Sequence, residues 1–232
     1  MRRLFRLFTY FTPWEWGLWL FSVLGILLSF FLFDGGAPLR LLASLVGVTS
    51  ILLNAKGNPI GQGLMLLFSA LYGILSFGEA YYGEMITYLG MTAPMALLSL
   101  ITWLRHPYGE GHSQVTVGHP GRKTVLSTLL LSLPVTVGFY LILAAFETAE
   151  LPLSTLSVAT SFVAVALTFL RSPFFSLAYA ANDTVLILLW IRASAGNLAH
   201  ISLVVCFSLF LLNDLYAFLS WLRLEKKQRT EK

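Results

Sequence analysis

Eight stretches of apolar residues, separated by short polar segments, constrain the fold of this chain more than any other feature. Each stretch is close to the ~20 residues that an α-helix needs to cross ~30 Å of hydrocarbon. Pro94 and Pro134 lie inside two of them, which bundled helices tolerate because neighbouring groups satisfy the freed backbone. The sequence therefore predicts an all-α, polytopic membrane protein with spans at residues 17–33, 38–53, 61–77, 85–104, 124–146, 152–170, 174–191 and 201–222.

The composition excludes a soluble fold. Hydrophobic residues make up 57% of the 232 positions and charged residues only 11%, whereas a soluble domain carries about a quarter charged residues. A soluble protein of this size has too little interior to bury that much apolar surface. The single cysteine, Cys206, lies in an apolar stretch, so the sequence predicts no disulfide framework.

The first apolar stretch follows three arginines, as a signal peptide would, but no small-residue cleavage site follows Phe33. We therefore expect an uncleaved membrane span. The preceding residues 4–8 interleave leucine and phenylalanine with arginine, which predicts a short helix on the membrane surface.

The basic residues predict the orientation. With the eight spans numbered alternately, Arg40 and Arg192 fall on one side and the other 13 of the 15 basic residues on the opposite side. The positive-inside rule makes the basic side cytoplasmic, so both termini are expected in the cytoplasm. The cytoplasmic set is Arg2, Arg3, Arg6, Lys56, Arg105, Arg122, Lys123, Arg171, Arg223, Lys226, Lys227, Arg229 and Lys232.

Spans two to four and six to eight resemble each other. The first set ends in TWLR at 102–105 and the second in SWLR at 220–223, and their first turns carry Asn58-Pro59 and Ser172-Pro173. The offsets are 114 and 118 residues. Coincidence is the alternative, because tryptophan before arginine is common at a cytoplasmic interface. Span five restores the orientation, so the copies would be parallel, which is a transporter design with the site between the copies.

Two Asn-Asp pairs lie within predicted spans, Asn182-Asp183 in the seventh and Asn213-Asp214 in the eighth. An ionisable residue at this depth costs several kcal/mol, which makes each pair a candidate binding site. The alternative is that the pairs only hydrogen-bond neighbouring helices.

Aromatic residues share a helix face with Asp183. Tyr179 precedes it by four residues and Trp190 follows it by seven. An acid flanked by aromatic rings suits a cationic or heteroaromatic ligand through cation–π contact and stacking. The alternative is that Trp190, which lies near a helix end, only anchors the helix at the membrane interface.

Polar faces on the third and fourth spans are further candidates. They line a wet path or pack with satisfied hydroxyl groups, and the sequence does not distinguish the two. The residues are Ser69, Tyr72 and Ser76 in the third span and Glu84, Tyr88 and Thr92 in the fourth. Asn54, at the cytoplasmic end of the second span, is also a candidate for substrate binding.

No motif points to an enzyme. Gly109-Glu-Gly111 lacks the Gly-Lys-Ser/Thr continuation of a phosphate-binding loop. The loop histidines match no zinc spacing, and no serine, histidine and acid cluster stands out. We therefore expect no catalytic residues, metal or cofactor, and no nucleic-acid partner.

Three motifs resemble a known family. The segments NAKGNPIGQ at 54–62 and AYYGEMITYLGM at 80–91, together with Asn182-Asp183 and Trp190, are similar to the Pnu family of bacterial vitamin transporters. Within it, the PnuC branch, which carries nicotinamide riboside, is the most similar. The resemblance extends over residues 38–223.

The resemblance implies a three-plus-one-plus-three arrangement similar to SWEET sugar transporters, plus an additional N-terminal helix. The implied parts are 1–36 with the surface segment and first span, 37–105 and 151–223 as repeats, 106–150 as cytoplasmic loop and linking helix, and 224–232 as cytoplasmic tail. It also implies facilitated diffusion, with a cytoplasmic kinase that traps the substrate by phosphorylation. A homo-oligomer is possible, and the sequence does not decide whether the chain forms one.

Nicotinamide riboside, a cation without phosphate, suits Asp183 and aromatic faces, while Asn182 and Asn213 can bond its amide and hydroxyl groups. The family's nicotinamide riboside binders are associated with paired tryptophans one turn apart, but here Ile187 and Ala193 stand where a partner of Trp190 would lie. Carriers of thiamine, riboflavin or a deoxynucleoside, a membrane-embedded enzyme and a binding subunit of an energised importer are the alternatives.

Overall fold

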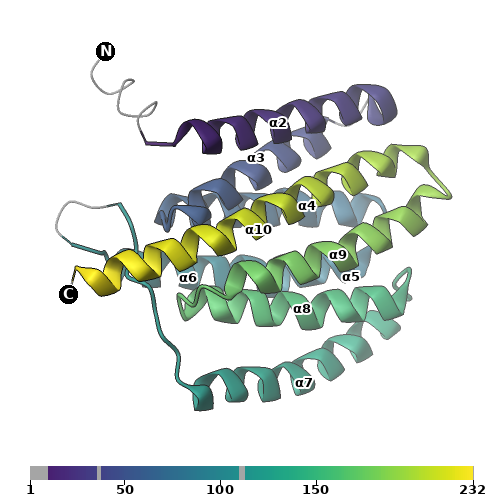
Figure 1. The fold of residues 1–232 in the computed structure, drawn as a ribbon. Coiled ribbons are helices and arrows are strands. Elements are labelled where there is room, and N and C mark those ends of the chain that lie inside the picture. The colour runs from purple at the N-terminus through teal and green to yellow at the C-terminus, as the bar shows by residue number, and fades with distance from the viewer. Residues whose placement is uncertain (1–9, 36–37, 110–112, 232) are drawn as a thin grey trace.

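The computed structural model describes residues 10–35, 38–109 and 113–231, which form a bundle of helices lying side by side (Figure 1). The predicted surface helix at residues 4–8 lies outside these residues. The α-helices are α2 (Pro13–Ser29), α3 (Pro38–Ala55), α4 (Pro59–Gly78), α5 (Tyr82–Thr87), α6 (Ala93–Arg105), α7 (Arg122–Ala145), α8 (Leu151–Phe169), α9 (Phe175–Ser194) and α10 (Ile201–Thr230). Two π-helical turns, η1 (Phe30–Asp34) and η2 (Tyr88–Thr92), and a 3₁₀ turn, η3 (Leu198–His200), complete the set.

These helices correspond to the predicted spans, which confirms the prediction of a multi-pass helical membrane protein. In the described part of the chain, seven helices are long and apolar enough to cross a membrane, and α5, η2 and α6 together form one of them. The remaining predicted span, the seventh, is α9, which has 20 residues and packs between α8 and α10 (Figure 1). Its central Asn182 and Asp183 make it less apolar than the others.

Local sequence explains where helices begin and bend. Thr12 and Glu15 form a reciprocal capping box around the first turn of α2, with proline at its first position. The Asn58 side chain accepts the backbone N–H of Ile60 at the start of α4. Pro94 has no N–H to donate back along the helix, and the chain just before it widens into the π turn η2.

The last helix is longer than predicted. The eighth span was expected to end at residue 222, and 224–232 to be a tail, but α10 continues to Thr230. Ion pairs at i,i+4, such as Arg229 with Glu225 at 2.6 Å, favour helix there. The Gln228 side chain also accepts the backbone N–H of Val117 and donates to the carbonyl of Val115, which ties α10 to the 113–117 segment.

The two predicted repeats make matching contacts. The indole Nε1 of Trp103, at the end of α6, donates to the Thr168 carbonyl in α8 at 3.1 Å. The indole of Trp221, in α10, donates to the Asn54 carbonyl in α3 at 2.7 Å. Each repeat thus bonds the first helix of the other, and the paired residues are offset by 118 and 114 positions, as in the sequence.

The turns that follow α3 and α8 match as well. Gly57 and Arg171, 114 residues apart, both adopt the left-handed conformation, with φ of 66° and 56°. Their carbonyls accept the backbone N–H groups of Val115 and Gly118, each at 2.9 Å. These paired contacts indicate two parallel repeats, α3 to α6 and α8 to α10.

Helices α2 and α7 lie on opposite sides of this pair of repeats (Figure 1). Among its described residues, α7 buries only Leu143, which suits a linking helix that faces lipid. Helix α2 packs on α3 and α10. Its buried Glu15 carboxylate accepts from Lys56 at 3.1 Å and from the Tyr216 hydroxyl at 2.8 Å, so α2 is fastened at this end of the bundle.

Candidate functional site

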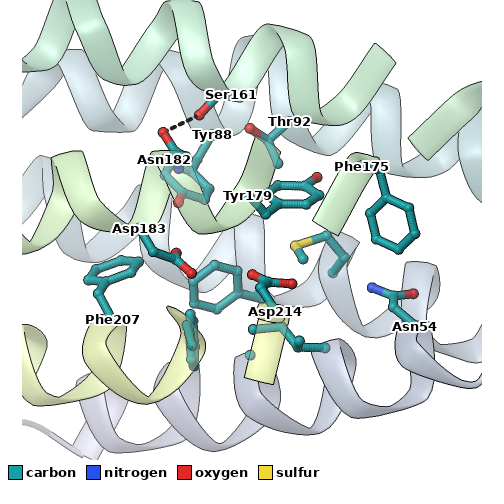
Figure 2. A pocket seen from close by; sticks show the side chains of 15 residues that line it. Asn54, Tyr88, Thr92, Ser161, Phe175, Tyr179, Asn182, Asp183, Phe207 and Asp214 are labelled. Atoms are coloured by element: carbon teal, nitrogen blue, oxygen red, sulfur yellow. Dashed lines mark hydrogen bonds between the residues drawn. The ribbon is translucent and has the colours of Figure 1, made fainter. Parts of the chain in front are cut away.

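A small cavity lies between the two repeats, enclosed by α3, α4, η2, α8, α9 and α10 (Figure 2). Its volume is ≈ 20 Å³, which admits roughly one or two water molecules. Among the residues that the structure describes, no lysine or arginine lines it. The lining residues are Gly47, Ile51, Asn54, Met65, Phe68, Tyr88, Thr92, Ser161, Phe175, Tyr179, Asn182, Asp183, Phe207, Phe210 and Asp214.

The lining itself reflects the two repeats. Gly47 and Ser161 are 114 residues apart, as are Phe68 and Asn182. Corresponding positions therefore face the same cavity from both copies, which places it where the pseudo-twofold axis of the repeats would run. A site between parallel repeats is the usual position in transporters of this design.

Two carboxyl groups meet in this cavity. Asp183 on α9 and Asp214 on α10 are 4% and 3% exposed, and both carboxyl groups line the cavity, close enough to interact electrostatically. Two ionised carboxylates in a medium of low dielectric repel strongly, so the pair is stabilised by a shared proton or by a bound cation. The Oδ2 atom of Asp183 has no hydrogen-bond partner among the described residues. The pair can therefore attract a cation into the cavity.

Asn182 lies beside the acidic pair and is oriented by α8. Its Oδ1 accepts hydrogen bonds from Thr160 at 2.8 Å and from Ser161 at 3.0 Å (Figure 2). Because its carbonyl is occupied, the amide hydrogens on Nδ2 are the groups left for a ligand. The side chain can therefore donate to a carbonyl or hydroxyl oxygen.

Aromatic rings form much of the cavity wall. Phe68 packs edge-on against Tyr88 and Phe210, with ring centroids 5.7 and 5.6 Å apart. Gly47 admits the Phe210 ring, since a Cβ atom there would lie 2.3 Å from its Cζ. Such walls suit a flat ring or a cation placed over an aromatic face.

Tyr72 and Trp190 lie one layer away from the cavity lining. The Trp190 indole donates to the Tyr72 hydroxyl at 2.8 Å. Tyr72 packs against Tyr88 of the lining, with centroids 4.5 Å apart, while Trp190 packs against Tyr81 and His200 near the end of the bundle. The structure thus places both residues between the cavity and the bundle end that carries Arg40.

Two further asparagines predicted from the sequence, Asn54 and Asn213, differ in whether they line the cavity. Asn54 lines the cavity, and its Oδ1 accepts from Gln62 at 2.9 Å. Asn213 faces away, toward α2, and its Nδ2 donates to Ser22 and to the Leu209 carbonyl, each at 2.8 Å. Of the residues predicted from the sequence, the structure brings together at the cavity Asn54, Tyr88, Thr92, Tyr179, Asn182, Asp183 and Asp214.

Sequence reasoning missed the phenylalanines of α10. Phe207 and Phe210 precede Asp214 by seven and four residues, so all three share one helix face. That spacing was visible in the sequence. The contribution of α3 through Gly47 was not, because a glycine carries no chemical signal of its own.

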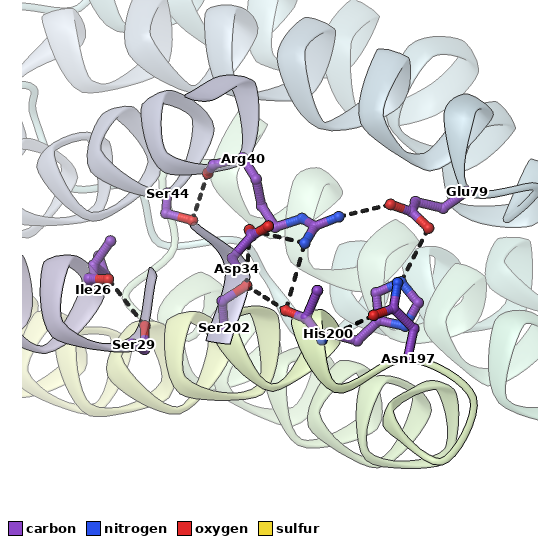
Figure 3. Close-up of polar contacts among 10 residues, drawn as sticks. Ile26, Ser29, Asp34, Arg40, Ser44, Glu79, Asn197, His200 and Ser202 are labelled. Carbon is purple, nitrogen blue, oxygen red and sulfur yellow. Dashed lines mark hydrogen bonds and ion pairs between the residues drawn. The ribbon is translucent and has the colours of Figure 1, made fainter. Parts of the chain in front are cut away.

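Packed rings and ion pairs form a closure toward each end of the bundle. Toward the bundle end that carries Lys56, Trp103 and Trp221 pack against each other at 5.4 Å and against Phe175. Toward the end that carries Arg40, the Arg40 guanidinium binds Asp34 at 2.8 Å and Glu79 at 2.6 Å (Figure 3). A ligand larger than water can enter or leave only when one of these closures opens.

An all-α membrane bundle with a cavity between parallel repeats is typical of membrane transporters. Residues 37–223 match the sequence profile of the family described as nicotinamide mononucleotide transporter. The chain belongs to this family.

Individual relatives agree with this assignment. A protein of Neisseria mucosa named nicotinamide riboside transporter PnuC is 25% identical over 213 residues, which cover 90% of this chain and 81% of that protein. A Haemophilus influenzae protein of the same name is 24% identical over 192 residues, covering 82% and 81%. The crystal structure of the vitamin B3 transporter PnuC has the same fold, with a TM-score of 0.81, 22% identity and 94% coverage of both chains.

Proposed function

We propose that this chain is a uniporter that imports nicotinamide riboside across a bacterial cytoplasmic membrane by facilitated diffusion. The observation that carries the proposal is the Asp183–Asp214 pair in an aromatic-walled cavity without basic side chains. The pyridinium of nicotinamide riboside is a flat cation, which carboxylates and aromatic faces both attract. The names of the two relatives support the same substrate.

The cavity disfavours a phosphorylated substrate. Nicotinamide mononucleotide carries a phosphate, and a phosphate beside Asp183 and Asp214 would be repelled in a medium of low dielectric. No lining side chain carries a positive charge to offset it. The family description mentions the mononucleotide. The charges of this site favour nicotinamide riboside instead, because its sugar carries no phosphate.

The closures support carriage by alternating access. The present cavity is too small for a nucleoside, so substrate enters when one closure opens and leaves when the other does. No nucleotide-binding motif supplies energy, so net import would depend on removal of substrate inside, which a cytoplasmic kinase achieves by phosphorylation. The basic-residue asymmetry supports a cytoplasmic position for the Lys56 end and for both termini.

Binding to the purified protein tests the choice of substrate. We expect nicotinamide riboside to bind and nicotinamide mononucleotide to bind at least ~10-fold more weakly, a difference of about 1.4 kcal/mol, because of carboxylate–phosphate repulsion. Isothermal titration with both ligands measures this directly. Thiamine and riboflavin belong in the same panel, and a tighter complex with either would reassign the substrate.

A further inference from the structure

We propose that closure of the Arg40 end binds one proton, held between His200 and Glu79, so that acid on that side keeps the transport path shut. The proposal deepens the proposed function because it assigns regulation to the same path. It rests on the hydrogen bonds of a buried histidine and on the charge balance around it (Figure 3).

Both ring nitrogens of His200 face acceptors. Nε2 lies 3.1 Å from Oε2 of Glu79, and Nδ1 lies 3.2 Å from the Ala193 carbonyl. The other carboxylate oxygen of Glu79 accepts from Arg40 at 2.6 Å, which favours the ionised, acceptor-only form of Glu79. A neutral imidazole has one N–H, so only the imidazolium ion satisfies both contacts.

The charges balance only with that proton. Arg40 and protonated His200 supply two positive charges, and Asp34 and Glu79 supply two negative ones. The His200, Arg40 and Asp34 side chains are 7%, 6% and 4% exposed, and that of Glu79 is 28% exposed. Loss of the proton would leave an uncompensated negative charge in a largely buried cluster, which is unfavourable.

The surroundings of His200 favour a cation as well. The Trp190 ring lies 5.2 Å from the imidazole, a distance at which an aromatic ring attracts a cation, and the Tyr81 ring lies 6.3 Å away. Burial, and then the carboxylates of Glu150 and Glu79, raise the pKa of Tyr81, so its hydroxyl stays neutral at physiological pH. At the same end, Arg192 pairs with Glu150 at 3.1 Å.

The cluster joins the elements that must separate if this end opens. Asp34 comes from η1, Arg40 from α3, Glu79 from the end of α4, and His200 from the α9–α10 connection. The Ser202 hydroxyl adds a bond to Asp34 at 3.3 Å. Opening would separate His200 from Glu79 and from the Ala193 carbonyl, so the two contacts that hold the proton exist only in the closed form. Falling pH, which supplies that proton, therefore favours closure.

Cys206 provides a reporter that needs no substrate. It lies on α10, one turn beyond Ser202, and is 2% exposed. Its reaction with a polar maleimide therefore requires opening of the bundle. Comparing variants with the parent protein at the same pH removes the intrinsic pH dependence of the thiol. Failure of this test is thus separate from failure of the substrate assignment.

The decisive variant is His200→Gln, which cannot become charged. At about pH 5.5 we expect its Cys206 to react roughly threefold to tenfold faster than that of the parent, and at about pH 8 the two rates to converge. Glu79→Gln removes the carboxylate that faces His200, so its Cys206 should show the same change in labelling rate. This variant replaces His200→Gln in the test if His200→Gln folds poorly. His119→Gln is the matched control, because His119 pairs with Glu225 on an exposed surface, and it should follow the parent.

The uptake rate gives a second readout. Initial uptake by the parent in liposomes should fall as the external pH is lowered from about 8 to about 5.5, and His200→Gln should be nearly insensitive. A ratio of His200→Gln to parent labelling that is the same at both pH values would overturn the proposal. So would equal pH sensitivity of His200→Gln and His119→Gln.

Discussion

Asp183→Asn is expected to weaken binding of nicotinamide riboside by about 1–3 kcal/mol, the range for a desolvated cation–π contact or a charge-assisted hydrogen bond. The substitution keeps the shape of the side chain and removes the charge that attracts the pyridinium. Asp214→Asn should have a comparable effect, because the two carboxyl groups meet in the cavity. Titration calorimetry on folded variants measures both.

Asn213→Ala is the matched control for this prediction. Asn213 neighbours Asp214 in sequence but bonds Ser22 on α2 instead of lining the cavity. We expect the Asn213→Ala substitution to lower thermal stability and to leave the affinity of the folded protein for nicotinamide riboside unchanged. If Asp183→Asn and Asp214→Asn both bind ligand as the parent does, the cavity is not the substrate site.

Trp221→Ala is expected to lower the free energy of unfolding by about 3 kcal/mol or more, the effect of removing a large buried aromatic side chain. Trp221 is fully buried against Trp103 and Phe175, and its indole holds α3 through the Asn54 carbonyl. Trp103→Ala should cost a similar amount, because the corresponding indole holds α8. Thermal unfolding in detergent gives the comparison.

The matching contacts of Trp103 and Trp221 allow two further tests of this prediction. Because the two rings touch, the double variant should cost less than the sum of the single ones. Trp103→Phe and Trp221→Phe keep most of the packing and remove the indole N–H, so each should cost about 1 kcal/mol. A large loss for one phenylalanine variant and none for the other would contradict equivalent roles in two repeats.

Much of the fold was predictable because the bilayer sets the length and polarity of each span. The cavity was predictable in part. Asp183 and Asp214 stand out in apolar sequence, but periodicity alone did not show that Asn213 faces α2 while Asn182 lines the cavity. Trp190 shares a face with Asp183, yet lies one layer away, and it stays a candidate to meet substrate when the Arg40 end opens.

The closures were not predictable from the sequence. Arg40 was interpreted only as one of two basic residues on the outer side. Its partners Asp34 and Glu79 lie 6 and 39 residues away, and His200 joins them through Glu79. Contacts between residues so far apart depend on how helices pack, which no local pattern in a single sequence specifies.

Uptake of labelled nicotinamide riboside into empty liposomes tests the central claim most directly. The account predicts protein-dependent uptake that stops when the internal concentration equals the external one, with no ATP, sodium gradient or proton gradient present. Enclosing a kinase that phosphorylates the substrate should then raise the internal label above the external concentration. Accumulation of free nicotinamide riboside above the external concentration in empty, energised liposomes would contradict facilitated diffusion, and absence of uptake would contradict the substrate.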